Sequence, residues 1–322
     1  MTIFLRYDNT SLQDGIGAQE LRISGVYALS RAFGLGYIHC PVIRVIEDIG
    51  QDLGGGRSQS ELMSTFNAFF NFPNSKKSPT NPIYLDIKTL SLRKLMSLLT
   101  KYRFSSKDVV VTVLLPQGIL DRLPILYEFA ARKLRSMNRD LLASHFSSGV
   151  VLHVRRGYDE KYADLKYARM RHLPFTYFSD MLKALNAKKL LPNESRILVH
   201  TDLVNKLTKW SPSQKGILDG YSLNSGKSGN SEIVLEAYDL SKEITFPENL
   251  NYEILYCADL FEAFLDMSTT PILVQGKSAF SYLAGIVNPN FVIFPPLQKS
   301  AKLRRWKSYE KFRVNLREEL LG

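Results

Sequence analysis

The sequence has few of the residues that build metal sites, disulfides or membrane spans. Its two cysteines, Cys40 and Cys257, and its five histidines form no spacing typical of a zinc site, and two cysteines do not make a disulfide framework. No window approaches roughly eighteen uncharged apolar residues. The N-terminal stretch carries Arg6, Asp8 and Asp14, so we expect neither a signal peptide nor a membrane span. Scarce cysteine predicts a reducing, cytoplasmic setting.

Acidic residues are fewer than basic ones, with 31 Asp and Glu against 42 Lys and Arg, for a net charge of +11. Such a surface attracts phosphates, nucleotide sugars, nucleic acid or anionic lipid, and the charge alone does not choose among them. No element interleaves a basic stripe with aromatic residues, which disfavours a nucleic-acid partner without removing that alternative. With 322 residues and 45% apolar content, the chain is long enough for two domains with a real core.

The chemically densest stretch is residues 149–159. Residues 150–154 are apolar except at His153, the pattern of a strand covered on both faces in a parallel sheet. Arg155 and Arg156 follow at the strand end, where open α/β sheets bind ligands, and two guanidinium groups suit a diphosphate. The alternative is an arginine pair on solvated surface, and the preceding strand favours the anion site.

A second candidate loop follows the first strand, residues 2–7. Gly15, Gly17 and Gln19 precede apolar residues at helical spacing as far as Ala32. Glycines there let backbone N–H groups approach a phosphate at a helix start, although glycines after a strand can also be plain turn residues.

The third candidate is residues 271–285, where a buried strand runs into small polar residues and a helix start. Ser278, Ala279, Phe280 and Ser281 would present N–H groups and hydroxyls to a phosphate. A serine there can equally be an ordinary helix cap.

Between these segments, strands alternate with helices, which predicts an α/β fold. Further strands are expected within residues 34–41 and at 83–87, 109–115 and 196–202, with helices at 90–99, 119–142 and 172–185. The tail, residues 299–321, is basic and amphipathic, so we expect a closing helix packed across both domains, with membrane association as the lesser alternative.

Two clusters have both a structural and a functional interpretation. Phe66, Phe69, Phe70 and Phe72 are expected to pack a helix into the N-terminal core, the alternative being a platform for an acceptor sugar. The basic residues at 132–139 most simply form a solvated helix face, although they could steer an anionic acceptor or rest on a membrane.

The three candidate segments resemble, in this order, motifs of the fucosyltransferase superfamily. Residues 153–157 resemble the start of its His-x-Arg-Arg-x-Asp motif, with Tyr158 in the acidic place and Asp159 one place later. Residues 15–19 resemble its Gly-x-Gly-x-Gln loop. Residues 278–281 resemble its Ser-Ser-Phe-Ser segment, with Ala279 replacing the second serine.

The resemblance implies a GT-B-like α/β fold in which two Rossmann-like domains face each other across a cleft. We expect an N-terminal, acceptor-side domain at 1–148, a nucleotide-sugar domain at 149–300 and a closing helix at 301–322. The implied activity is inverting, metal-independent transfer of a sugar, with GDP-fucose favoured as donor, to a hydroxyl of a glycan acceptor, and no cofactor. The chain has no Asp-x-Asp sequence, in agreement with metal independence.

The resemblance also assigns residues to roles. Arg156 is expected to stabilise the leaving diphosphate, and Asp159 is the candidate general base. An acid near the start of the helix before residue 271 would read guanine, either Glu262 or Asp259. The residues expected to bind the nucleotide sugar are Gly15, Gly17, Gln19, His153, Arg155, Glu262, Ser278, Ala279, Phe280 and Ser281. A nucleotide- or phosphate-binding protein that transfers nothing is the main alternative.

Overall fold

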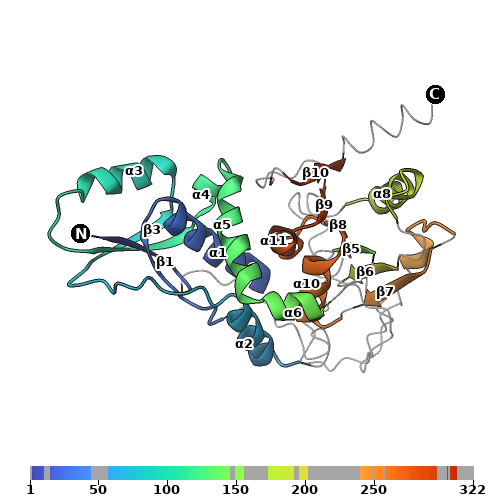
Figure 1. Ribbon diagram of the computed structural model, residues 1–322, viewed down its shortest axis with the longest axis horizontal. Coiled ribbons are helices and arrows are strands. Elements are labelled where there is room, and N and C mark those ends of the chain that lie inside the picture. The colour runs from blue at the N-terminus through green and yellow to red at the C-terminus, as the bar shows by residue number, and fades with distance from the viewer. Residues whose placement is uncertain are drawn as a thin grey trace, which may run out of the picture.

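Two parallel sheets, one from each half of the chain, flank a layer of helices in the computed structural model (Figure 1). The structure describes residues 2–10, 15–44, 57–145, 149–155, 173–191, 196–201, 240–248, 250–256, 258–295, 303 and 305–309 of the 322.

The N-terminal sheet has the strand order β2-β1-β4-β3, and every neighbouring pair is parallel. Its elements are β1 (Ile3–Tyr7), α1 (Ile16–Ala32), β2 (Gly36–Ile38), α2 (Gln59–Phe69), β3 (Ile83–Thr89), α3 (Leu92–Lys101) and β4 (Val109–Leu115). The chain then forms α4 (Gln117–Leu120), the short 3₁₀ helix η1 (Pro124–Leu126), α5 (Tyr127–Met137) and α6 (Arg139–Ser144).

The C-terminal sheet has the order β10-β9-β8-β5-β6-β7, and its pairs are also parallel. Its elements are β5 (Val150–Val154), α8 (Phe175–Ala187), β6 (Ile197–Thr201), η4 (Leu240–Lys242), β7 (Tyr252–Tyr256), α10 (Leu260–Thr269), β8 (Ile272–Val274), α11 (Ala279–Val287), β9 (Phe291–Phe294) and β10 (Lys307–Ser308). The α/β fold predicted from the alternation of elements is confirmed, and it has two parallel sheets.

One continuous hydrophobic cluster joins the two halves. It includes residues of β1 and β4 from one sheet, of β5 and β8 from the other, and of the helices α1, α5, α10 and α11 between them (Figure 1). A second cluster, on the other face of the C-terminal sheet, contains α8 and the alternate residues Val150, Leu152 and Val154 of β5. Because side chains alternate along a strand, His153 and Val151 point the other way, toward the helices between the sheets.

The structure departs from the predicted elements in three places. The single helix expected over 119–142 is divided into α4, η1, α5 and α6, with Pro124 starting η1. Strands β7 and β9 were not predicted. Of the predicted closing helix, the structure describes only Leu303 and residues 305–309, where Lys307–Ser308 forms a strand beside β9. Leu303 and Trp306 are buried in the shared cluster.

Among the described helices, none combines the length and apolar character that a membrane crossing requires.

Candidate functional site

The carboxyl ends of β5 and β8 bring together two of the three candidate segments. Arg155 follows β5 and Ser278 follows β8, and these two strands are hydrogen-bonded neighbours. Nη1 of Arg155 donates to Oγ of Ser278 at 3.3 Å. Residues 123 positions apart are thus in contact at the sheet edge where α/β folds bind ligands.

Ser278 is the N-cap of α11. Its Oγ accepts a hydrogen bond from the N–H of Phe280 at 3.2 Å and another from Arg155. The hydroxyl therefore caps the first turn of the helix and also anchors the Arg155 side chain. Ala279 is the first helical residue and Phe280 the second, and both are partly exposed. The free N–H groups and the positive end of the helix dipole make such a start attractive to an anion.

Ser281 has a different position from Ser278. Its side chain is fully buried, and its Oγ donates to the carbonyl oxygen of Gly276 at 3.0 Å or that of Ser278 at 3.3 Å. The hydroxyl therefore closes the turn between β8 and α11. Gln275 supports the same turn by donating from Nε2 to the Ser281 carbonyl.

His153, the last but one residue of β5, is a neutral imidazole. Burial, and then the charges of Arg155 and His200, lower the pKa of His153 to about 3. Its Nδ1 is buried and has no hydrogen-bond partner among the described residues. Gly276 lies so close that a Cβ there would be 2.5 Å from the carbonyl oxygen of His153 and 3.1 Å from Nδ1. Only glycine lets the turn before α11 pass over this strand end.

The glycine loop opens α1, which packs directly against α11. A Cβ added to Gly17 would lie 2.8 Å from Cα of Phe280, so this glycine allows the two helices to approach at their N-terminal ends. Gly15 is the N-cap, and Gln19 is buried and donates from Nε2 to the carbonyl oxygen of Arg44 at 2.7 Å. Helix packing thus accounts for Gly17, and contact of this loop with a ligand stays a prediction.

The two acids considered for base recognition lie at the start of α10. Asp259 is the N-cap and accepts from the N–H groups of Phe261 and Glu262. Arg57 of the N-terminal half contacts both acids, with Nε 2.8 Å from Oδ2 of Asp259 and Nη2 3.3 Å from Oε1 of Glu262. Glu262 keeps about half of its side chain exposed, whereas Asp259 is mostly covered, so Glu262 is the more accessible acid.

One turn further along α10, Asp266 forms a polar bridge between the halves. Its Oδ1 is 2.9 Å from Nε2 of His145, and its Oδ2 is 2.8 Å from Nε2 of His200 on β6. Burial alone would raise the pKa of Asp266, but the hydrogen bonds and charges of His200 and His145 outweigh it, and the pKa lies below its ordinary value. His145 also lies 3.6 Å from Glu262. No local sequence pattern pointed to this bridge.

The remaining predictions concern the two catalytic residues and the phenylalanine cluster. Arg156 and Asp159, the two predicted catalytic residues, lie outside the described residues. The phenylalanine cluster is core, as expected: Phe66, Phe69, Phe70 and Phe72 are buried, and the rings of the first three contact Phe264 of α10 in edge-on or tilted arrangements. Within the described part of the chain, no group of three or more His, Cys, Asp or Glu is arranged to hold a metal ion.

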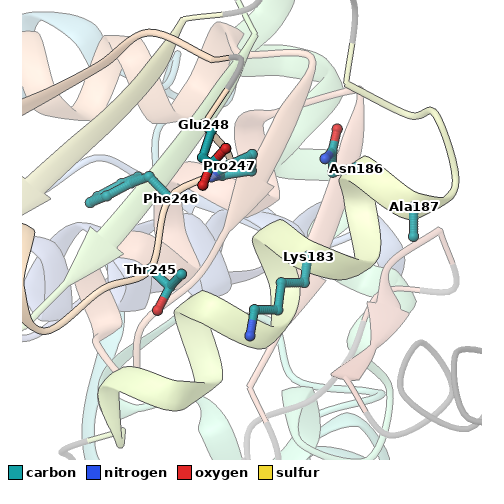
Figure 2. A pocket seen from close by; sticks show the side chains of 7 residues that line it. All are labelled: Lys183, Asn186, Ala187, Thr245, Phe246, Pro247 and Glu248. Atoms are coloured by element: carbon teal, nitrogen blue, oxygen red, sulfur yellow. The ribbon is translucent and has the colours of Figure 1, made fainter.

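A pocket lies elsewhere on the C-terminal half, where α8 meets residues 245–248 (Figure 2). Its volume is about 270 Å³, and it is lined by Lys183, Asn186, Ala187, Thr245, Phe246, Pro247 and Glu248. None of the predicted site residues lines it.

Comparison with protein-family models gives no match, and neither does comparison with curated proteins. Among solved structures the chain is similar to a mutant of Arabidopsis thaliana FUT1 in complex with GDP, with a TM-score of 0.42 and 10% identity over 95% of this chain and 72% of that one. It is also similar to POFUT1 in complex with GDP-fucose, with a TM-score of 0.38 and 10% identity over 95% and 97% of the two chains. A third is E. coli heptosyltransferase WaaC with ADP-2-deoxy-2-fluoro heptose, with a TM-score of 0.36 and 11% identity over 99% and 98%.

The groups brought together at this edge are suited to binding an anion. A guanidinium, a helix start and a neutral imidazole with an unpartnered buried nitrogen meet at the ends of β5 and β8. Guanidinium and helix N–H groups bind phosphate oxygens, while a neutral imidazole can hydrogen-bond without repelling the cation beside it.

Proposed function

We propose that this chain is a GT-B glycosyltransferase that moves a sugar from a nucleotide donor to a hydroxyl of a glycan acceptor, by inversion and without a metal or cofactor. The observation that carries the proposal is the contact between Arg155 and Ser278, which joins a strand-end arginine to the start of α11. The same two segments carry the resemblance of the sequence to fucosyltransferases. The scarcity of cysteine supports the cytoplasm as the place of action.

The proposed chemistry follows from where charge develops. Breaking the bond between an anomeric carbon and a diphosphate leaves negative charge on the leaving group, and fixed cations and N–H dipoles stabilise it. Arg156 is the main donor in this proposal, and Arg155 and the N–H group of Ala279 bind the other phosphate oxygens. Asp159 is the candidate base that would take the proton of the attacking hydroxyl.

GDP-fucose is the donor favoured by the resemblance, with Glu262 as the acceptor of the guanine edge. The contact of Glu262 with Arg57 bears on this proposal, because an N–H donor of the guanidinium occupies the carboxylate that would accept from the guanine edge. Binding of the base would therefore replace this donor on Glu262 with those of guanine. The exposed half of the Glu262 side chain leaves room for such an exchange.

The deciding experiment is isothermal titration of the full chain with GDP, UDP, CDP and ADP. We expect GDP to bind tightest. Arg155→Met should weaken that binding by roughly tenfold or more, as expected for loss of a hydrogen bond to a charged group. Arg103→Met, which removes an exposed arginine from the N-terminal half, is the matched control and should bind like the parent.

Transfer is tested separately from binding. Arg156→Ala should lower sugar release from GDP-fucose by on the order of 10²-fold or more. Normal turnover in this variant would remove the phosphate role of Arg156. Tight GDP binding by the parent chain without sugar release from any donor would instead identify a binding protein that transfers nothing.

A further inference from the structure

The segment around α3 has a strongly one-sided charge. Between Asp86 and Asp108 the sequence has no acid and six basic residues, Lys88, Arg93, Lys94, Lys101, Arg103 and Lys107. All six side chains are exposed, and within the described part of the chain none forms an ion pair. Asp108 cannot neutralise them, because it is buried and accepts hydrogen bonds from the N–H groups of Thr2 and Thr80.

The helix is fixed so that this charge faces outward. Leu95 is fully buried in the shared hydrophobic cluster, and Leu98, Leu99 and Tyr102 pack against that cluster from the same side of α3. Ser91 caps the helix by accepting from the N–H of Lys94. Figure 1 shows α3 at the outer margin of the N-terminal half, far from the C-terminal sheet. The opposite side of α3 is therefore held toward solvent.

Large apolar side chains are exposed among these charges. Phe104, in the turn after α3, is 90% exposed, and Met96 is 50% exposed, with Leu92 one turn before it. The guanidinium of Arg103 lies 5.4 Å from the centre of the Phe104 ring, so a cation and an aromatic ring project together. We call Leu92, Arg93, Lys94, Met96, Lys101, Arg103 and Phe104 the α3 surface.

The segment between α4 and α5 adds residues of the same kind. A Cβ at Gly118 of α4 would lie 2.8 Å from the carbonyl oxygen of Leu90, so α4 lies against the residues that lead into α3. Leu123 and Ile125 follow α4 with exposed side chains, next to the exposed Arg122. The exposed apolar character of the α3 surface is thus repeated in a neighbouring segment, where the exposed Asp121 balances the charge of Arg122.

We propose that the α3 surface docks the protein on an anionic lipid bilayer. Lysine and arginine side chains are attracted to anionic headgroups, and exposed apolar residues enter the boundary between headgroups and acyl chains. The apolar Leu92 and Met96 favour lipid over nucleic acid, because single-stranded nucleic acid is held by stacking on several aromatic faces. Phe104 is the one aromatic residue of the α3 surface, since the neighbouring Tyr102 packs against the hydrophobic cluster. The proposal does not depend on sugar transfer.

The test is co-sedimentation of the full chain with vesicles of phosphatidylcholine, with and without phosphatidylglycerol. We expect binding only to the vesicles that contain phosphatidylglycerol, and weaker binding at high salt. The double variant Arg93→Glu and Lys94→Glu should lose at least about fivefold in partition for each charge removed. Phe104→Ser should lose roughly tenfold in partition, because the bilayer no longer buries an aromatic side chain at this position. The side chain is exposed in the free protein, so the substitution should leave the fold unchanged.

Two controls in the C-terminal half match these changes. Lys183→Glu reverses an exposed charge on α8, and Leu190→Ser removes an exposed apolar side chain. Both should sediment like the parent chain. Equal losses in the α3 variants and the controls would overturn the proposal, as would equal binding to neutral and anionic vesicles. Tighter binding to a single-stranded oligonucleotide than to anionic vesicles, abolished by the double variant, would also overturn it in favour of nucleic acid.

Discussion

Ser278 and Ser281 lie three positions apart at the start of α11, and their hydroxyls have different tasks. Ser278 joins the helix cap to Arg155, whereas Ser281 is fully buried and bonds only to carbonyl oxygens of its own turn. Of the two serines that the resemblance assigned to the nucleotide sugar, Ser278 contacts Arg155 through its hydroxyl, and Ser281 does not. The proposed function therefore gives Ser278 a role in ligand binding, whereas the hydrogen bonds of Ser281 serve the fold.

Ser278→Ala and Ser281→Ala should lower the free energy of unfolding by similar amounts, each about 1 kcal/mol, one through the lost cap and the other through a lost buried hydrogen bond. Only Ser278→Ala should also weaken nucleoside diphosphate binding, by roughly fivefold, because Arg155 loses its anchor. Urea unfolding and calorimetric titration measure the two effects. Equal affinity losses in both variants would show that Ser278 has no particular role in binding.

Glu20 is an unusual residue in α1. It is fully buried, and neither carboxyl oxygen has a hydrogen-bond partner among the described residues. Burial raises the pKa of Glu20 well above its ordinary value. An acid whose pKa is raised by folding contributes its full stability below the ordinary pKa, and that contribution is lost as the pH rises through the folded-state pKa.

Glu20→Gln should therefore stabilise the protein at neutral pH, by on the order of 1 kcal/mol, because the glutamine cannot ionise. The gain should shrink as the pH falls toward about 4, where the glutamate is protonated in both states. Thermal unfolding of the two proteins across this range measures the difference. A variant that is less stable than the parent at neutral pH would mean that the ionised carboxylate is stabilised in the fold.

At the scale of elements, the close contact between α1 and α11 depends on Gly17, which has no side chain. Gly17→Ala should destabilise the protein by about 1–3 kcal/mol, since the new Cβ would press on the backbone of Phe280 and force the helices apart. Gly25→Ala in the same helix is the control. Its Cβ would meet side-chain atoms only, Cδ1 of Leu120 at 2.5 Å and Cγ of Pro116 at 3.1 Å, and no backbone atom of α11.

Both variants gain helix propensity, so a difference between them isolates the contact between the helices. Chemical unfolding measures it, and equal stabilities would mean that α1 and α11 can separate at this point without cost. If the glycine loop also lies near the nucleotide sugar, Gly17→Ala should weaken nucleoside diphosphate binding as well.

Strand prediction succeeded for the longer buried apolar runs and missed the four-residue β9, although β9 is apolar throughout. β4 and β5 are central strands, and their apolar runs reflect cover on both faces. β7 lies at the sheet edge, its residues are exposed or only partly buried, and Glu253 interrupts the pattern, so it gave no comparable signal. β10 has two residues and exists only because β9 lies beside it, which no local pattern can reveal.

The helix expected over 119–142 failed for reasons of hydrogen bonding. Pro124 cannot donate a backbone hydrogen bond, and η1 begins at that residue. Asn138 ends α5, and its side-chain amide donates to the carbonyl oxygens of Leu134 and Phe69. α5 retains the apolar spacing that predicted one helix. The proline precedes α5 on its N-terminal side, and the contact of Asn138 with α2 ends the helix on its C-terminal side.

Only part of the candidate site could be predicted from the sequence. Arg155 and Ser278 could be placed at one sheet edge because each follows a recognisable buried strand. The links from Asp266 to His145 and His200 span 121 and 66 positions, and that from Arg57 to Glu262 spans 205. The pairs Asp266–His145 and Arg57–Glu262 depend on how the two halves pack. The pair Asp266–His200 depends on how α10 packs against β6, and no local periodicity encodes any of the three.

At the scale of the whole molecule, the two halves share one core instead of meeting at a polar surface. The shared cluster passes without interruption from β1 and β4 through α1 and α11 to β5 and β8. Asp266 adds polar contacts at the same boundary, with His145 from the N-terminal half and His200 from the C-terminal sheet. Because the apolar contacts cross the boundary, we expect the halves to unfold in one cooperative transition.

Asp266→Asn should lower the free energy of unfolding by roughly 2 kcal/mol at neutral pH, since hydrogen bonds to a charged group are lost on both sides of the boundary. The pKa of Asp266 is lowered in the fold, so its contribution is present above the ordinary pKa of aspartate and is lost as the pH falls through the folded-state pKa. The difference from the parent should therefore shrink below about pH 4. Asp86→Asn, at an exposed position on β3, is the control and should change little. Unfolding followed by circular dichroism at several pH values measures this. A separate early transition in Asp266→Asn would mean that the polar bridge, more than the shared core, keeps the halves together.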